Sequence, residues 1–112
     1  MTAAVPTHDR FERPALAWYL LFHPGLASLA AMSASQPLHD AVAARLPVPL
    51  PSRSLMRSFL IGTFFVHIGE SVLAYRTAKA AGMDRSASRW ARETMIVGFP
   101  SILRLQKIAA EG

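Results

Sequence analysis

The sequence contains no cysteine in its 112 residues. Disulfide bonds, thiolate nucleophiles and cysteine-based metal sites are therefore excluded. A glycine-rich phosphate loop, a GxSxG nucleophile elbow and an HExxH zinc pair are also missing. A chain this short leaves little room for a soluble catalytic domain. We therefore expect a non-enzymatic protein without a cofactor or a dedicated metal site.

Acidic residues are few, with seven Asp and Glu against twelve Lys and Arg and a formal net charge of +5. The basic residues flank apolar runs instead of forming one long patch, and no aromatic-basic motif accompanies them. We therefore expect them to meet anionic lipid headgroups in a bilayer, and we expect no nucleic-acid partner.

Charge is also missing from long parts of the chain. Residues 14–36 carry no formal charge, and residues 58–75 carry one, at Glu70. Because about 20 mostly apolar residues cross the roughly 30 Å of bilayer hydrocarbon, each run is long enough for a transmembrane helix. The first run also fits a signal peptide, with Arg10 and Arg13 before it and small residues after it.

The third apolar run is shorter. Its uncharged core, residues 94–103, spans a bilayer only if Arg92 and Arg104 reach opposite interfaces, and Asp84 is a good N-cap for this helix. An amphipathic helix on the membrane surface is the alternative. We predict an all-α integral membrane fold that forms a single domain over residues 1–112. Its three transmembrane helices are expected at about residues 15–34, 56–78 and 88–107.

Prolines and glycines divide the chain. Pro24 and Pro100 each remove one helical hydrogen bond, which predicts kinks in the first and third helices, and Gly82 ends the second. Residues 36–53 predict a proline-rich connector with a short amphipathic helix. Residues 1–13 predict a polar lead-in that is either flexible or interfacial. Three spans would place the termini on opposite sides. The basic residues, seven against five, weakly favour a cytoplasmic N-terminus.

Polar side chains nevertheless occur inside the apolar runs. His67 and Glu70 share one face of the second helix, and a carboxylate near the bilayer midplane costs about 3 kcal/mol on insertion scales. We expect polar groups on one face of the third helix to compensate this cost. The candidate intramembrane polar cluster is His67, Glu70, Glu93, Thr94, Ser101 and His23. We favour an interhelix clamp over a metal or proton site, because a metal needs three or four converging ligands.

Small and aromatic residues predict helix packing and the position of the membrane surfaces. Small residues let helix backbones approach closely in lipid. The expected packing glycines are Gly62, Gly69 and Gly98. Trp and Tyr are enriched at membrane interfaces. The expected interface anchors are Trp18, Tyr75 and Trp90.

The second half of the chain contains a spaced motif. It comprises the H-x-G-E run at residues 67–70 and the spaced residues Ala74, Gly82, Trp90, Thr94, Gly98 and Ser101. This motif resembles that of the transmembrane protein 254 family. The resemblance covers about residues 65–103. It implies a small three-helix integral membrane protein and no particular reaction. Two residues depart from the family: Glu93 replaces a glutamine, and Pro100 interrupts the last helix.

The function that we expect is that of a scaffold or accessory subunit, because the chain is short and has glycine and alanine faces for helix packing. It would bind another membrane protein or a second copy of itself. The alternative is an intramembrane binder of a lipid or sterol-like ligand, with His67 and Glu70 at the base of a pocket. A proton-linked or metal site is a third, weaker hypothesis.

Overall fold

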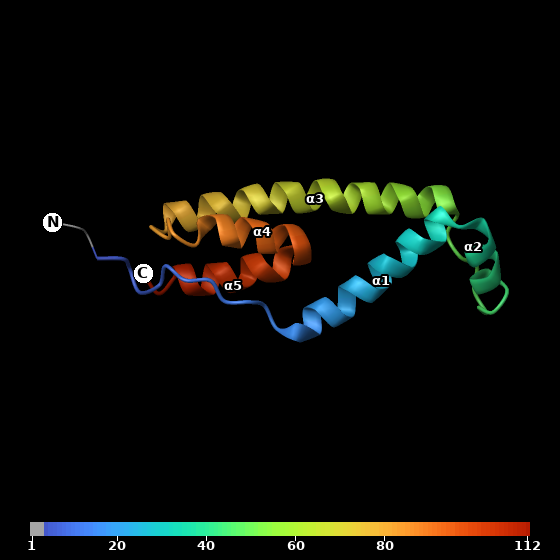
Figure 1. Ribbon diagram of the computed structural model, residues 1–112, viewed down its shortest axis with the longest axis horizontal. Coiled ribbons are helices and arrows are strands. Elements are labelled where there is room, and N and C mark those ends of the chain that lie inside the picture. Colours follow the sequence, from blue (N-terminus) through green and yellow to red (C-terminus); the bar gives the residue numbers. More distant parts are fainter. Residues whose placement is uncertain (1–3) are drawn as a thin grey trace. The chain divides into compact units, whose positions relative to one another are not determined.

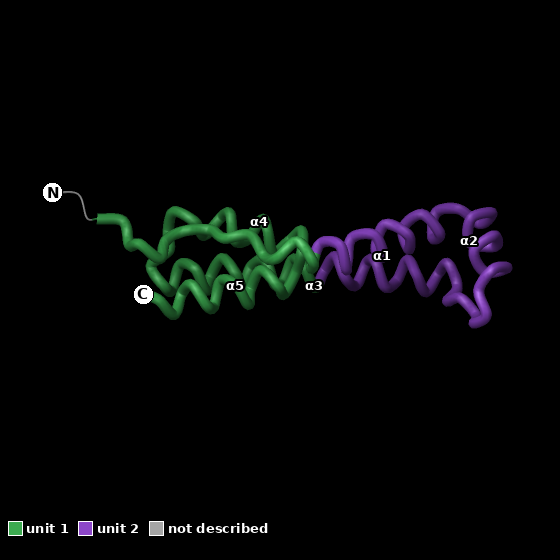
Figure 2. The backbone as a smooth tube through the Cα atoms, turned by 90° about the horizontal axis from the view of Figure 1, so that it is seen from below, with its two compact units in different colours: residues 1–18, 66–112 green, residues 19–65 purple. Residues whose placement is uncertain are grey.

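A computed structural model describes residues 4–112 of the chain, and these form helices without any strand (Figure 1). The five helices are α1 Leu16–Ala34, α2 Gln36–Ala43, α3 Arg53–Ala80, α4 Ala87–Val97 and α5 Phe99–Ala109. The all-α prediction is confirmed. The chain divides into two compact units (Figure 2): one contains the described residues up to 18 together with 66–112, and the other contains 19–65.

Two helices, α1 and α3, are long and apolar enough to cross a membrane. They correspond to the first two predicted spans. Only 11% of the most apolar window of α1 and 6% of that of α3 is buried within the protein. Most of their apolar side chains therefore face outward, unlike those of a core helix in a soluble domain. α1 continues through Pro24 as one helix, so the proline does not break it.

The third predicted span, residues 88–107, is wrong. The segment is divided at Gly98 into α4 and α5, which have 11 residues each. Gly98 has φ +79° and ψ −142°, a backbone conformation that L-residues with a Cβ rarely adopt. Pro100 lies in the first turn of α5, where a missing N–H costs nothing. The residues form a hairpin of two short helices, which lies along the second half of α3 (Figure 1).

The end of α3 follows the prediction. Gly82 has φ +77°, and the N–H of Met83 donates to the carbonyl of Ala78 at 2.9 Å. This is the hydrogen-bond pattern of a glycine-terminated helix. The short turn that follows directs the chain back along α3, which allows the hairpin to pack there.

The core of the first unit lies where α3, α4 and α5 meet. The two members on α3 are alanines, which lets the larger side chains of the hairpin pack closely against that helix. The members of this core are Ala74, Ala78, Met83, Ala87, Trp90, Ile102, Leu105 and Ile108. Trp90 is the largest fully buried side chain among residues 4–112.

The second unit contains most of α1, α2 and the beginning of α3. Arg53 and Arg57 both donate to the carbonyl of Ser33 at the end of α1, with shortest distances of 2.9 and 3.1 Å. Cations suit that position because helix C-terminal carbonyls have no intrahelical partner. α2 is the short helix expected in the connector, with Ser35 as its N-cap.

Candidate functional site

His67 joins α3 to the break in the hairpin. Its Nδ1 donates to the carbonyl of Met95 at 3.0 Å, and a Cβ added at Gly98 would lie 2.8 Å from its Nε2. Met95 belongs to the last turn of α4, where carbonyls lose their helical partners. His67 therefore supplies the hydrogen bond that the break in the helix removes.

A second polar contact lies one turn further along α3. Ser71 Oγ donates to the carbonyl of Ala91 at 2.7 Å. The two contacts place His67 and Ser71 of α3 against Met95 and Ala91 of α4. The acceptors, however, are backbone carbonyls and not the side chains that the sequence suggested.

The contact with the hairpin tip lies in the middle of the apolar part of α3. At 1.5 Å per residue, His67 is about 15 Å from Arg57 and about 14 Å from Arg76 along the helix axis. Half of a bilayer's hydrocarbon is about 15 Å thick. If α3 spans a bilayer, the broken backbone at Gly98 lies near its midplane, where an unsatisfied carbonyl costs several kcal/mol.

Glu70 remains without a protein partner. It is half-buried, and it forms no hydrogen bond or ion pair with any residue between 4 and 112. The expected pairing of Glu70 with His67 is therefore not part of the structure. No group of three His, Asp or Glu within this range is placed to hold a metal ion.

The predicted residues on the hairpin are buried and have varied partners. Glu93 Oε1 lies 3.8 Å from Arg13 Nε, in a segment that the sequence did not connect to this helix. Thr94 Oγ1 donates to the carbonyl of Trp90 at 2.7 Å, one turn earlier in α4. Ser101 Oγ is fully buried and has no hydrogen-bond partner among the described residues.

The remaining predicted residues lie elsewhere. His23 belongs to the second unit, and its ring meets that of Tyr19 at 5.4 Å. A Cβ at Gly62 or at Gly69 would have nothing within 4 Å, in contrast to Gly98. Tyr75 is 42% exposed, which is compatible with an interface anchor.

Trp90 is a core residue, not the interface anchor that the sequence suggested. Its exposure is 0%, its Nε1 donates to the carbonyl of Arg10 at 3.1 Å, and its ring meets that of Phe11 edge-on at 4.8 Å. A buried Trp needs a partner for its N–H, and the N-terminal segment provides it.

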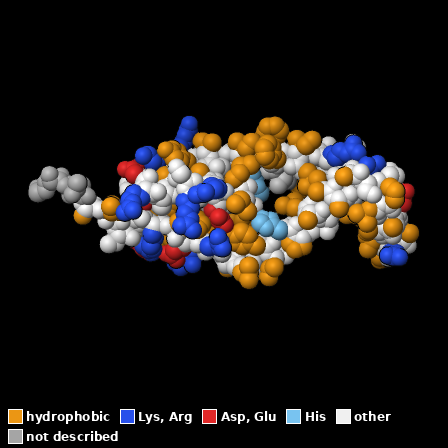
Figure 3. All heavy atoms as spheres, viewed as in Figure 1, with side chains coloured by type: hydrophobic (Ala, Val, Ile, Leu, Met, Phe, Trp, Pro, Cys, Tyr) orange, Lys and Arg blue, Asp and Glu red, His pale blue; other side chains and the backbone are white. Residues whose placement is uncertain are grey.

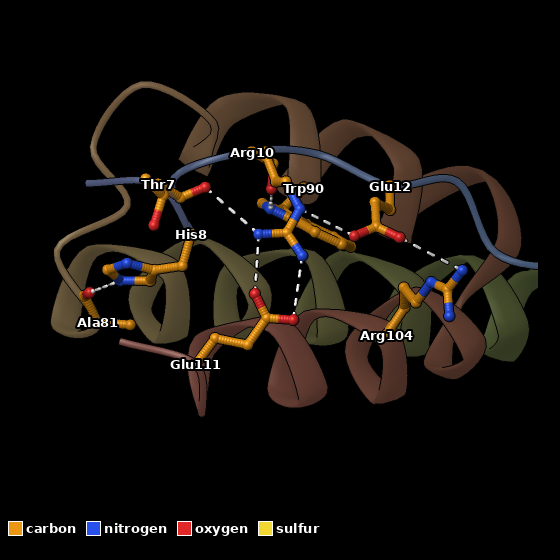
Figure 4. Close-up of polar contacts among 8 residues, drawn as sticks. All are labelled: Thr7, His8, Arg10, Glu12, Ala81, Trp90, Arg104 and Glu111. Atoms are coloured by element: carbon orange, nitrogen blue, oxygen red, sulfur yellow. Dashed lines mark hydrogen bonds and ion pairs between the residues drawn. The ribbon is translucent and has the colours of Figure 1, made fainter. Parts of the chain in front are cut away.

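The polar lead-in is ordered against the hairpin in the range that the structure describes. We call residues 7–13 the N-terminal strap. Arg10 forms an ion pair with Glu111 at 2.8 Å, and Glu12 lies 3.4 Å from Arg104 (Figure 4). Figure 3 shows that many acidic and basic side chains of this view lie over the region of α4 and α5. Of the two alternatives for the lead-in, the flexible one does not hold for the strap, because aromatic and ionic contacts fix it.

Asp9 of the strap caps α4 from a distance of 77 residues. Its carboxylate accepts from the N–H of Arg85 and of Ser86, both at 2.9 Å, and from Ser86 Oγ at 2.7 Å. Burial raises the pKa of Asp9, but these hydrogen bonds outweigh that effect and lower the pKa below its ordinary value. Asp84, the N-cap expected from the sequence, forms an ion pair with Lys79 instead, at 2.9 Å.

We expect Asp9→Ala to lower the free energy of unfolding by about 1–2 kcal/mol, because three hydrogen bonds at a helix N-terminus are lost. Because folding lowers the pKa of Asp9, its stabilisation is complete above the unfolded pKa of about 4 and disappears as the pH falls through the folded value. Unfolding in detergent micelles at several pH values measures both effects. Asp9→Asn is the control. If the difference between wild type and Asp9→Asn stays constant down to pH 3, the carboxylate does not carry this stabilisation.

These features define the class of protein. The chain is a helical protein with two apolar, outward-facing helices and a hairpin whose backbone break is satisfied by a side chain from the second of them. A family model described as transmembrane protein 254 matches residues 15–107. The chain belongs to the transmembrane protein 254 family, and the resemblance seen in its sequence is confirmed. No curated protein and no solved structure matches the chain.

Proposed function

We propose that this protein crosses the bilayer twice, through α1 and α3, and that the α4–α5 hairpin enters the bilayer from the side of the two termini without crossing it. Three observations support this proposal. The Arg10–Glu111 ion pair joins the two ends of the chain. The tip of the hairpin lies beside His67. The segment 94–103 around the tip carries no charge.

The distribution of basic residues supports the same arrangement. If the chain crosses twice, the connector lies on one side of the membrane and carries three basic residues. The other nine basic residues lie on the side of the termini. The three are Arg45, Arg53 and Arg57; the nine are Arg10, Arg13, Arg76, Lys79, Arg85, Arg89, Arg92, Arg104 and Lys107. Nine against three is a stronger bias than the seven against five of a three-span chain. The positive-inside rule then places both termini in the cytoplasm.

Within this arrangement, the protein acts as an accessory subunit that binds a transmembrane helix of another membrane protein or of a second copy. The observation that carries this proposal is the outer face of α3. Residues 62, 66, 69 and 73 follow helical spacing on the side opposite to His67 and Ser71. All four are exposed, and two of them are glycines that leave open space. Glu70, which has no partner among residues 4–112, lies at the edge of this face.

We expect Gly69→Leu to abolish the larger complex seen by blue-native electrophoresis in mild detergent, because a bulky side chain would prevent close backbone approach. Val72→Leu is the matched control, since it adds bulk at an exposed position on a different side of α3. A wild-type protein that migrates only as a monomer would contradict the proposal. So would a complex that survives Gly69→Leu unchanged.

The alternative, a lipid or sterol-like ligand bound at His67 and Glu70, has less support. One ring nitrogen of His67 already donates to Met95, and the other faces Gly98. Of these two residues, only Glu70 remains available to bind a ligand.

A further inference from the structure

A groove lies between the start of α1 and the outer side of α5. Its volume is about 250 Å³, and both of its walls belong to the first unit. Pro14, Ala15 and Trp18 form one wall, and Leu103, Arg104 and Lys107 lie on the other. This site is separate from the His67 contact and contains none of the residues of the predicted polar cluster.

The groove combines an apolar floor with two cations. Arg104 and Lys107 are three residues apart on α5 and therefore share one face. Arg104 Nη2 lies 3.4 Å from Glu12, whereas its Nε is buried without a hydrogen-bond partner among residues 4–112. Lys107 forms no ion pair within the same range.

The charges around the groove leave an excess cation. The strap and hairpin bring together the cations of Arg10, Arg13, Arg104 and Lys107 and the carboxylates of Glu12, Glu93 and Glu111. Glu111 Oε2 is 2.8 Å from Arg10, and Glu93 lies 3.8 Å from Arg13. The Arg10 hydrogen bond, and more weakly the charge of Lys107, lower the pKa of Glu111. Because Glu111 pairs with Arg10, Lys107 is the cation of this group that has no carboxylate of its own.

We propose that this groove binds an anionic phospholipid, with the phosphate against Lys107 and Arg104 and an acyl chain along Trp18 and Leu103. The proposal rests on the two-span arrangement, which directs the Lys107 end of the groove towards the headgroups of the leaflet that faces the termini and its Pro100 end into the hydrocarbon. A soluble anion would satisfy the cations but would leave Leu103, which is 54% exposed, in contact with water. Basic pockets beside transmembrane helices are suited to such headgroups.

The test uses the full-length protein in detergent micelles, titrated with phosphatidylglycerol or with phosphatidylcholine and observed by native mass spectrometry. We expect wild type to prefer phosphatidylglycerol and Lys107→Gln to bind it about fivefold more weakly. Lys79→Gln is the matched control. It removes the same charge from a residue that pairs with Asp84 outside the groove, and it should leave phosphatidylglycerol binding unchanged.

Three results would overturn the proposal: equal binding of the two lipids, equal losses in the two variants, or full displacement of the lipid by glycerol phosphate at the same concentration. The last result would assign the site to a soluble phosphate. Because binding is measured in micelles, it does not depend on membrane topology. A failed topology test with selective binding would refute the two-span arrangement while keeping the groove as a lipid site. A confirmed two-span topology without selective lipid binding would refute the groove proposal alone.

Discussion

Replacing Trp90 with alanine should lower the free energy of unfolding by about 3–5 kcal/mol, the largest effect that we expect from one substitution. The indole is fully buried in the core of the first unit, so its removal leaves a cavity that rigid helices fill poorly. The substitution also removes the hydrogen bond to the carbonyl of Arg10 and the ring contact with Phe11. The strap would then lose two of its attachments to α4 and keep the cap that Asp9 provides. Unfolding in mixed micelles, followed by circular dichroism, measures the loss.

Two controls separate the contributions of volume and hydrogen bonding. Trp90→Phe keeps most of the volume and loses the N–H, so we expect a smaller loss of about 1–3 kcal/mol. Tyr75→Ala removes an aromatic residue of comparable size from an exposed position and should cost much less. If Trp90→Ala proved as mild as Tyr75→Ala, Trp90 would be an interface anchor after all and the strap would not cover it.

Replacing Gly98 with alanine should cost about 2–3 kcal/mol. The residue has φ +79°, and an added Cβ would lie 2.8 Å from His67 Nε2. A strained backbone conformation and a displaced His67 each contribute to the cost, and the displaced ring would leave the Met95 carbonyl unsatisfied. The same micelle unfolding assay measures the change.

The sign of this effect distinguishes the hairpin from a continuous third helix. Within a regular helix, Gly→Ala stabilises by up to about 1 kcal/mol. Gly25→Ala in α1 is the matched control, because nothing lies within 4 Å of its added Cβ, and we expect it to be neutral or stabilising. A stabilising Gly98→Ala would show that residues 88–107 form one helix.

The sequence predicted the two apolar helices because their composition and length are local properties. It failed at Gly98, where the same local information fits two structures. Gly98 followed by Pro100 fits one kinked helix, and it also fits the end of one helix and the start of another. The second reading is correct because the carbonyl of Met95 finds a donor in His67, which lies 28 residues earlier.

The strap could not be predicted for a related reason. Asp9 and Ser86 are 77 residues apart, and no local pattern links an aspartate to a helix that begins so far away. The sequence did contain one signal. The lead-in carries Asp9, Phe11 and Glu12, which can cap a helix, pack as an aromatic and form an ion pair, and a flexible linker needs none of these groups. That His67 and Ser71 lie on one side of α3 follows from helical spacing alone, but their backbone acceptors on α4 do not.

The absence of cysteine allows the central proposal to be tested without removing any native thiol. Single cysteines at Thr7, Val48 and Ala110, all exposed in the structure, can be labelled in sealed vesicles with a maleimide that does not cross the membrane. The two-span arrangement predicts that Thr7→Cys and Ala110→Cys label from the same side and that Val48→Cys labels from the other. Labelling of Thr7→Cys and Ala110→Cys from opposite sides would contradict it, because α4 and α5 would then have to cross the bilayer as one helix.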